Sequence, residues 1–292
     1  MTDADQPALW RSSDAAAVDT QRRYMFWIKA HLAVLAACGL ISAWSPDNAC
    51  YERLVSGAVA LLMFGALMIG LLLKLTRIDD IWFRTRALAE NAKAAAWRFA
   101  MKPKPATTEL DEAEARAYEE ELAQLRKRFS QLEKVLVRFA DNGPQTTPEM
   151  QRLRSLPPAG RLEAYVRFRL QDQIDWYRNK AKANANAETR WFYWIFLIEA
   201  LAIVVAVSRI FLHQEYNPVG GVTAMAAGFV AWSQTKRFSD LATSYAVACD
   251  DLKGLREGVS RVHDDTALLR LVADVEGAIS REHRLWVVKR TS

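Results

Sequence analysis

Cysteine and histidine are scarce in this 292-residue chain, and their spacing excludes several kinds of site. The three cysteines, Cys38, Cys50 and Cys249, lie in separate segments and form no CxxC pair, so neither a disulfide framework nor a cysteine-based metal site is expected. The four histidines are scattered and give no zinc signature. A glycine-rich phosphate loop and a nucleophile elbow are missing too. We therefore expect no catalytic residue, no metal and no cofactor, and the chain is not expected to be an enzyme.

The first 20 residues lack the basic start and the cleavage site of a secretory signal. They are polar and acidic, so residues 1–20 are predicted to form a polar tail. The apolar run that follows is then expected to stay in the mature protein as a membrane span.

Long apolar runs are what the chain has in place of such motifs. A helix needs roughly 20 apolar residues to cross a bilayer core, and in lipid only helices or closed barrels satisfy the backbone. Four runs approach this length, at about 25–44, 54–75, 191–212 and 219–233. The short turns 45–53 and 213–218 join them in pairs. We predict an all-α membrane protein with four transmembrane helices arranged as two hairpins, together with long cytosolic helices.

Lysine and arginine predict the orientation of these spans. The two turns contain a single basic residue, Arg53, whereas the other ends of the spans are rich in lysine and arginine. The positive-inside rule therefore places both termini and the long middle segment in the cytoplasm of a multi-pass protein.

Apolar residues at alternating spacings of four and three predict a bundle or coiled coil beneath the membrane. One such seam runs through a helix expected from about 109 to 140, and others lie in 241–262 and 268–279. The seam of 109–140 includes Tyr118, Leu122, Leu125, Phe129, Leu132, Leu136 and Phe139. On the fourth span Gly220, Ala224 and Gly228 repeat every four residues, as in a helix-packing face. Seams and small-residue face together favour a homo-oligomer.

Three polar residues of the spans are candidates for a pore or gate. Glu199 lies near the middle of its span, where a charge costs about 2.5–3.5 kcal/mol on insertion scales. It either lines a cation path or locks helices together by hydrogen bonds. Arg209 lies about 15 Å further along the same helix, too far for a direct pair. His31 is either packed between helices or part of a proton relay.

A basic cluster precedes the third span. Its members with adjacent aromatic residues are candidates for binding the phosphates and bases of a nucleotide or short oligonucleotide. The candidates are Arg161, Arg167, Arg169, Trp176, Tyr177, Arg178, Lys180 and Lys182. The other interpretation is a positive-inside flank with a solvated helix face.

Three segments lie around the predicted spans: RALAENAKAAAWRF at 86–99, YVRFRLQDQIDWYRNKA at 165–181 and EGAISREHRLW at 276–286. They resemble a known family, the SLATT proteins, which are two-transmembrane effectors associated with SMODS and SLOG. With the two hairpins they resemble two SLATT units in tandem. The first unit would cover 21–140 with cytosolic helices 78–101 and 109–140, and 141–160 would be a linker. The second unit would cover 161–292, with cytosolic helices 161–189 and 236–290.

The resemblance implies an anti-phage effector in the bacterial inner (cytoplasmic) membrane that acts by abortive infection. It would form an oligomeric pore or a membrane-disrupting assembly. The gating signal would be a nucleotide or oligonucleotide made by a nucleotidyltransferase-like partner enzyme, and an inhibitory partner is a further expectation. A non-conducting membrane scaffold or sensor that recruits a partner through its coiled coil remains the alternative. The spans lack the several polar residues and breaks of a solute transporter.

Overall fold

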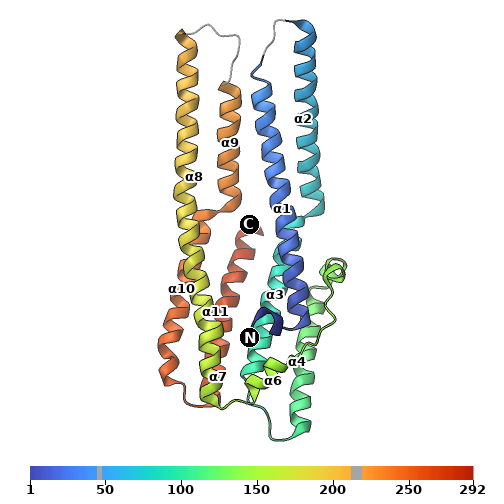
Figure 1. Cartoon of the computed structure of the whole chain (residues 1–292), viewed down its shortest axis with the longest axis vertical. Coiled ribbons are helices and arrows are strands. Elements are labelled where there is room, and N and C mark those ends of the chain that lie inside the picture. Colours follow the sequence, from blue (N-terminus) through green and yellow to red (C-terminus); the bar gives the residue numbers. More distant parts are fainter. Residues whose placement is uncertain (45–47, 212–218, 292) are drawn as a thin grey trace. The chain divides into compact units, whose positions relative to one another are not determined.

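The computed structural model describes residues 1–44, 48–211 and 219–291, and its regular elements in these ranges are helices without a β-strand (Figure 1). Side chains are described for residues 1–44, 48–208 and 219–280. The all-α prediction is therefore confirmed. The predicted turn 213–218 and residues 45–47 of the other turn lie outside the described residues.

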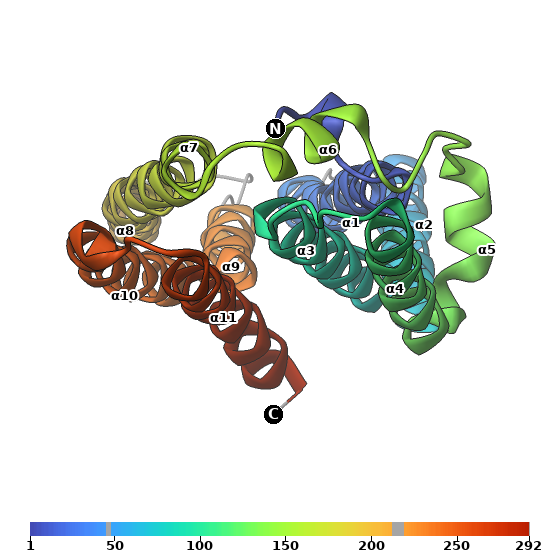
Figure 2. The ribbon, with the colours of Figure 1, turned by 90° about the horizontal axis from the view of Figure 1, so that it is seen from below.

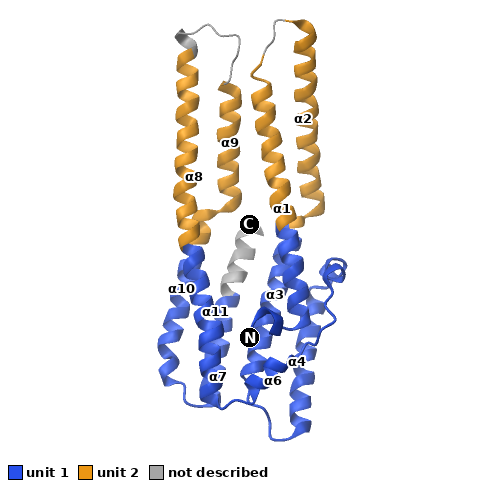
Figure 3. Ribbon diagram, viewed as in Figure 1, with its two compact units in different colours: residues 1–21, 79–181, 243–292 blue, residues 22–78, 182–242 orange. Residues whose placement is uncertain are grey.

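The chain forms two compact units, and each unit is assembled from separate segments of the sequence (Figure 3). Unit 1 contains residues 1–21, 79–181 and 243–292, and unit 2 contains residues 22–78 and 182–242. Helices α1 (Ala8–Ile41) and α8 (Gln171–Phe211) each contribute to both units. Each unit therefore draws on both halves of the chain.

Unit 2 holds the apolar helices. Besides its parts of α1 and α8 it contains α2 (Ala49–Thr76) and α9 (Val219–Lys236). Among the described residues, three helical stretches are long and apolar enough to cross a membrane: Ala8–Ile41, Ala49–Met101 and Pro158–Ser208. Helix α9 is not one of them, so the count of four spans stays a prediction. Only 6%, 6% and 0% of the three apolar windows are buried within the chain, which leaves their side chains free to contact lipid or another protein.

The second apolar helix of each pair ends in the same way. Arg77 follows α2 with φ 46°, and Arg237 follows α9 with φ 49°, both in the left-handed region. A new helix starts at the next residue, at Ile78 and at Phe238. The first backbone turn after each apolar helix is thus made by an arginine in a strained conformation.

Unit 1 is a bundle whose helices are seen nearly end-on in Figure 2. Trp97 of the third helix meets Tyr165 edge-on at 5.6 Å between ring centroids, and Phe99 stacks on Tyr118 at 4.5 Å. The predicted positions Leu268, Val272, Val275 and Ile279 are all buried, so the last helix packs with the predicted face inward. Unit 1 contains α4 (Thr108–Arg128), α6 (Pro148–Arg154), α7 (Pro158–Tyr165), α11 (Asp265–Thr291) and most of α3 (Ile78–Met101) and α10 (Phe238–Glu257), whose first residues belong to unit 2.

The prediction of a polar tail is wrong for residues 8–20. These residues form the first turns of α1, and Leu9, Trp10 and Ala16 are buried in the core of unit 1. The polar side chains on this face are satisfied locally, since the hydroxyls of Ser13 and Thr20 each donate to the carbonyl four residues earlier, at 2.6 Å. A hydroxyl group that donates a hydrogen bond to a carbonyl of its own helix can be buried. The polar composition of this segment therefore wrongly predicted an exposed tail.

The prediction of one continuous helix over 109–140 is also wrong. Helix α4 ends at Arg128 and is followed by the short helices η2 (Ser130–Leu132), α5 (Glu133–Leu136) and η3 (Val137–Phe139). The seam still packs in a bundle, because Leu122, Leu125 and Leu132 are 3%, 9% and 1% exposed. These leucines pack within the chain's own core and not between copies of a homo-oligomer. Apolar residues at spacings of three and four can be buried by a series of short helices as well as by one long helix. The spacing therefore could not show that α4 ends at Arg128.

The predicted linker 141–160 is not free chain. It contains α6, whose Met150 and Leu153 are buried in the core of unit 1. The Thr147 hydroxyl caps this helix by accepting from the Met150 amide, and Pro148 occupies the first turn.

Candidate functional site

A buried ion pair joins the segment before α8 to α11. A π-helical turn, η4 (Val166–Leu170), connects α7 to α8 and directs Arg169 into the core. Its Nε and Nη2 donate to the two carboxylate oxygens of Glu276 at 2.9 and 2.7 Å, and the Tyr165 hydroxyl donates to the same carboxylate at 3.0 Å. The side chains of the pair are 1% and 2% exposed. Such a bidentate pair fixes both position and orientation of its partners.

The electrostatics of this cluster keep Arg169 and Tyr165 each in one protonation state. Burial alone lowers the pKa of Arg169, but the negative charge and hydrogen bonds of Glu276 raise that pKa above its ordinary value. Burial, followed by the charge of Glu276, raises the pKa of Tyr165 well above its ordinary value. Arg169 therefore stays charged and Tyr165 stays a neutral hydrogen-bond donor at physiological pH.

Two further arginines are buried in unit 1 with partners of their own chain. Arg161 donates to the carbonyl oxygens of Met101 at 2.5 Å and Leu156 at 3.1 Å, and it pairs with Asp265. Arg154 pairs with Asp111 at 3.0 Å and with Glu114, and its guanidinium lies 4.2 Å from the centroid of Phe99. Both side chains tie separate helices together.

The structure therefore divides the predicted ligand-binding residues into two groups. Arg161, Arg169 and Tyr177 are each about 1% exposed, so they are corrected to internal packing residues that offer no surface to a soluble ligand. Trp176 is half-buried and meets Tyr245 edge-on at 5.4 Å. The exposed remainder consists of Arg167, Arg178, Lys180 and Lys182. Of these, Arg178 pairs with Asp175 at 2.6 Å, and Lys180 lies 5.7 Å from the ring centroid of Trp176.

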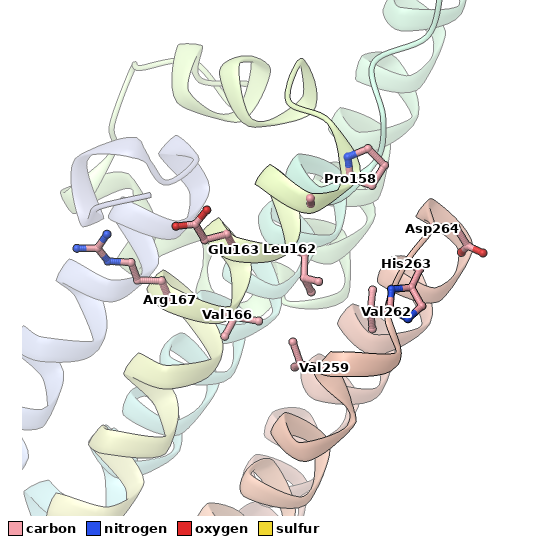
Figure 4. Close-up of a pocket in the computed structure, with 10 residues that line it drawn as sticks. Pro158, Leu162, Glu163, Val166, Arg167, Val259, Val262, His263 and Asp264 are labelled. Carbon is pink, nitrogen blue, oxygen red and sulfur yellow. The ribbon is translucent and has the colours of Figure 1, made fainter.

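Beside the π-helical turn lies a cavity of about 430 Å³ (Figure 4). Leu162 and Val166 face Val259 and Val262 across it, while Arg167 points away from those valines. The rim also carries Glu163, His263 and Asp264. This lining suits an apolar group held near charges. Among the described residues, no group of histidine, cysteine, aspartate and glutamate could hold a metal ion.

The pore candidates are distributed along the apolar helices of unit 2. Glu199 is exposed on α8, among exposed apolar residues such as Phe196 and Ile203. His31 is half-buried against α2, where a Cβ on Gly70 would lie 3.7 Å from its Cε1, and this position supports the packing interpretation. The Arg209 side chain lies outside the described residues.

The small-residue face of α9 is shifted from the predicted one. Gly221, and not the exposed Gly220, makes the close approach: a Cβ there would lie 3.0 Å from the Gly39 carbonyl oxygen. Ala224 takes part as predicted, since a Cβ on Gly39 would lie 2.6 Å from its Cβ. At Gly221 and Ala224 the face is used within the chain, between α9 and α1, whereas a Cβ on Gly220 or Gly228 would meet nothing within 4 Å. Gly220 and Gly221 lie four and three residues before Ala224, and both spacings place residues on one face of a helix, so spacing alone could not select the contacting glycine.

Sequence reasoning missed several of the residues described above. Arg154 is not among the predicted binding residues, and Glu276 enters the sequence analysis only within the segment 276–286. The sequence feature that could have identified these two residues is a single charged residue at a position that helical spacing assigns to the core. A pair of lysines near Trp232, Lys29 and Lys236, was not predicted either. Contacts between residues so far apart in the chain have no local signature.

These features define an all-α protein in which apolar, membrane-compatible helices continue into a polar helical bundle. Comparison with known families identifies the family to which this protein belongs. Residues 7–162 match the SMODS and SLOG-associating 2TM effector domain 3, and residues 165–286 match the SMODS and SLOG-associating 2TM effector domain 1. The chain belongs to the SLATT family, is a membrane protein and carries two of its domains in tandem. Neither the curated proteins nor the solved structures contain a match.

Proposed function

We propose that this protein is a membrane effector of an anti-phage system that forms an oligomeric pore or a membrane-disrupting assembly. A cytosolic nucleotide or oligonucleotide signal, or a partner enzyme, gates it. The family description of two effector domains with two spans each supports an effector in a membrane. The proposed location is the bacterial inner membrane, with both termini in the cytoplasm, in accord with the basic flanks of the spans.

Glu199 carries the proposal of an assembly. It is exposed on a helix whose apolar window is 0% buried within the chain. A carboxylate facing hydrocarbon costs about 2.5–3.5 kcal/mol on insertion scales, so such residues usually face protein or water. The described part of a single chain provides neither cover for it. Other copies of the chain would enclose Glu199, either along a water-filled path or in a hydrogen-bonded contact.

Helix α8 offers a route from a cytosolic signal to this carboxylate. It runs without a break from Gln171, two residues after Arg169, to Phe211 and belongs to both units. Suppose that α8 has two positions and that a ligand binds its first turns more tightly in one of them. Binding would then also shift the span, which is part of the same helix, toward that position. The exposed basic residues Arg167, Arg178, Lys180 and Lys182 are the proposed contacts for that ligand.

The test is the membrane potential of bacteria that express the chain, read with a voltage-sensitive dye. We expect depolarisation with growth arrest for the wild type and its loss for Glu199→Gln. Glu188→Gln is the matched control, because Glu188 is exposed on the same helix outside the predicted span. Equal depolarisation and equal assembly in both variants would remove Glu199 from the mechanism.

A normal potential in the wild type separates the remaining alternatives. If the protein is in the membrane and permeability stays unchanged after co-expression of the nucleotide-producing partner, the chain is not a pore. The non-conducting scaffold or sensor would then account for the family match.

A further inference from the structure

Unit 2 contains an apolar groove between α1 and α9. Its volume is about 640 Å³, and Trp191 of α8 closes part of it. Small side chains make the room: Ala33, Ala36 and Ala37 line it on α1, and Gly228 lines it on α9. All of these residues belong to unit 2.

The groove has a closed end and an open end. At the closed end the helices touch, because Cβ atoms on Gly39 and Gly221 would come within 2.6 Å of Ala224 and 2.9 Å of Leu40. Seven residues beyond Gly221 along α9 a Cβ on Gly228 would meet nothing within 4 Å. The two helices are in contact at one end and leave a gap at the other.

Two lysines stand at the open end, on either helix. Lys29 Nζ lies 5.6 Å and Lys236 Nζ lies 5.0 Å from the ring centroid of the same tryptophan, Trp232. Within the described parts of the chain neither lysine forms an ion pair with a carboxylate. The mouth of the groove therefore carries two lysines that form no ion pair with a carboxylate of the described residues.

The length of the groove matches one leaflet of a bilayer. From Lys29 to Leu40 the rise along α1 is about 16 Å, at 1.5 Å per residue. That is about half of the roughly 30 Å hydrocarbon thickness. Tryptophan and lysine are the residues that favour the interface between hydrocarbon and water, and here they meet at one end of the groove.

We propose that this groove binds an anionic phospholipid, with the phosphate between Lys29 and Lys236 and one acyl chain along Ala33, Ala36 and Gly228. Basic pockets between membrane helices bind anionic lipid headgroups through the same combination of charge and apolar contact. A free phosphate would use only the two lysines and would leave the groove unfilled. The lipid would contact α1 from the first family match and α9 from the second, so it would hold the two SLATT domains together. The proposal requires a membrane protein but not a pore.

The test uses the full chain purified in detergent, with lipid binding measured by native mass spectrometry. The two probes are dioleoyl phosphatidylglycerol and dioleoyl phosphatidylcholine, which share their acyl chains. We expect a preference of about 10-fold or more for the anionic lipid and its loss in Lys29→Gln/Lys236→Gln. Lys74→Gln is the control, since Lys74 is exposed in the last turn of α2 and does not line the groove.

A second variant tests the acyl site and leaves both lysines in place. Gly228→Leu fills space that is empty, so it should fold normally and should lower the binding of phosphatidylglycerol about 10-fold. Gly57→Leu is its control, because Gly57 is equally free of neighbours but lies on α2 away from the groove. Equal binding of the two lipids, binding unchanged in either groove variant, or full competition by glycerol phosphate would overturn the proposal.

Discussion

Arg167 and Arg169 are two positions apart, yet Arg169 is 1% exposed while Arg167 is on the surface. The π-helical turn that contains both residues separates them in this way. Arg169 contributes to the fold through Glu276, and Arg167 remains open to solvent beside Phe168, 5.2 Å from its ring centroid. Single residues in the basic cluster therefore require different tests, one of stability and one of binding.

At the residue scale we predict that Glu276→Gln destabilises unit 1 strongly. Removing one member of a buried ion pair costs about 3–5 kcal/mol, because the remaining charge stays buried without a partner. The melting temperature of the full chain in detergent micelles measures the effect. Glu121→Gln breaks an exposed pair with Arg98 in the same unit and should cost less than about 1 kcal/mol.

The apolar double variant Arg169→Met/Glu276→Leu provides a further comparison. It removes both charges together, so it should recover most of the stability that the single variant loses. A double variant as unstable as Glu276→Gln would mean that the shape of the site, and not its charge balance, sets the loss.

At the element scale, the two apolar helices α2 and α9 end in the same arrangement although they belong to different domains of the tandem. A left-handed arginine follows each helix, and a polar helix begins at once. A residue with a side chain pays about 1–3 kcal/mol for this backbone conformation. The same strained backbone conformation thus recurs at both junctions between an apolar helix and the polar helix that follows it.

We predict that Arg77→Gly stabilises the protein by about 1 kcal/mol, since glycine adopts a φ of 46° without strain. Arg84→Gly is the control, because Arg84 lies inside α3, where glycine should instead destabilise by about 1 kcal/mol. Thermal unfolding of the purified chain distinguishes the two. Destabilisation of the same size in both variants would show that the side chain of Arg77 matters more than its backbone.

At the scale of the whole molecule, the basic segment before the third span and the apolar helices are linked by one continuous helix, α8. Any ligand of the segment therefore acts on an element that also carries Glu199. The four exposed basic residues can neutralise only a few phosphates, and the slope of log affinity against log salt grows with that number, so we expect a measurable but modest salt dependence.

We predict that the full chain in lipid nanodiscs binds a dye-labelled RNA tetranucleotide and that Arg167→Gln/Lys180→Gln weakens this binding. Each lost phosphate contact should reduce the slope of log affinity against log salt by about 1. Fluorescence anisotropy measured across a salt series gives both quantities. Lys134→Gln, which changes a basic residue of the short helix α5, is the control. Absence of binding at low salt would leave this surface as a solvated flank of the membrane span.

Much of the architecture followed from local pattern. Apolar run length predicted helices able to cross a membrane, and the spacing of Leu268, Val272 and Val275 predicted their buried face. Helix formation and the position of a buried face both depend on nearby residues. The backbone hydrogen bonds of a helix join residues four apart, and its buried face repeats every three or four residues. The three quoted segments were enough to indicate the family.

Local pattern was thus enough to predict the helices, most of their apolar faces and the presence of two SLATT domains. The folded structure was needed to show which charges are internal, as with Arg161 and Arg169, and which glycine of α9 touches α1. It also decided that residues 8–20 belong to the core and that the seam through Leu122 and Leu132 is used within the chain. These outcomes depend on contacts between residues far apart in the chain. No local property of a segment encodes the partner that will satisfy its charge or cover its apolar face.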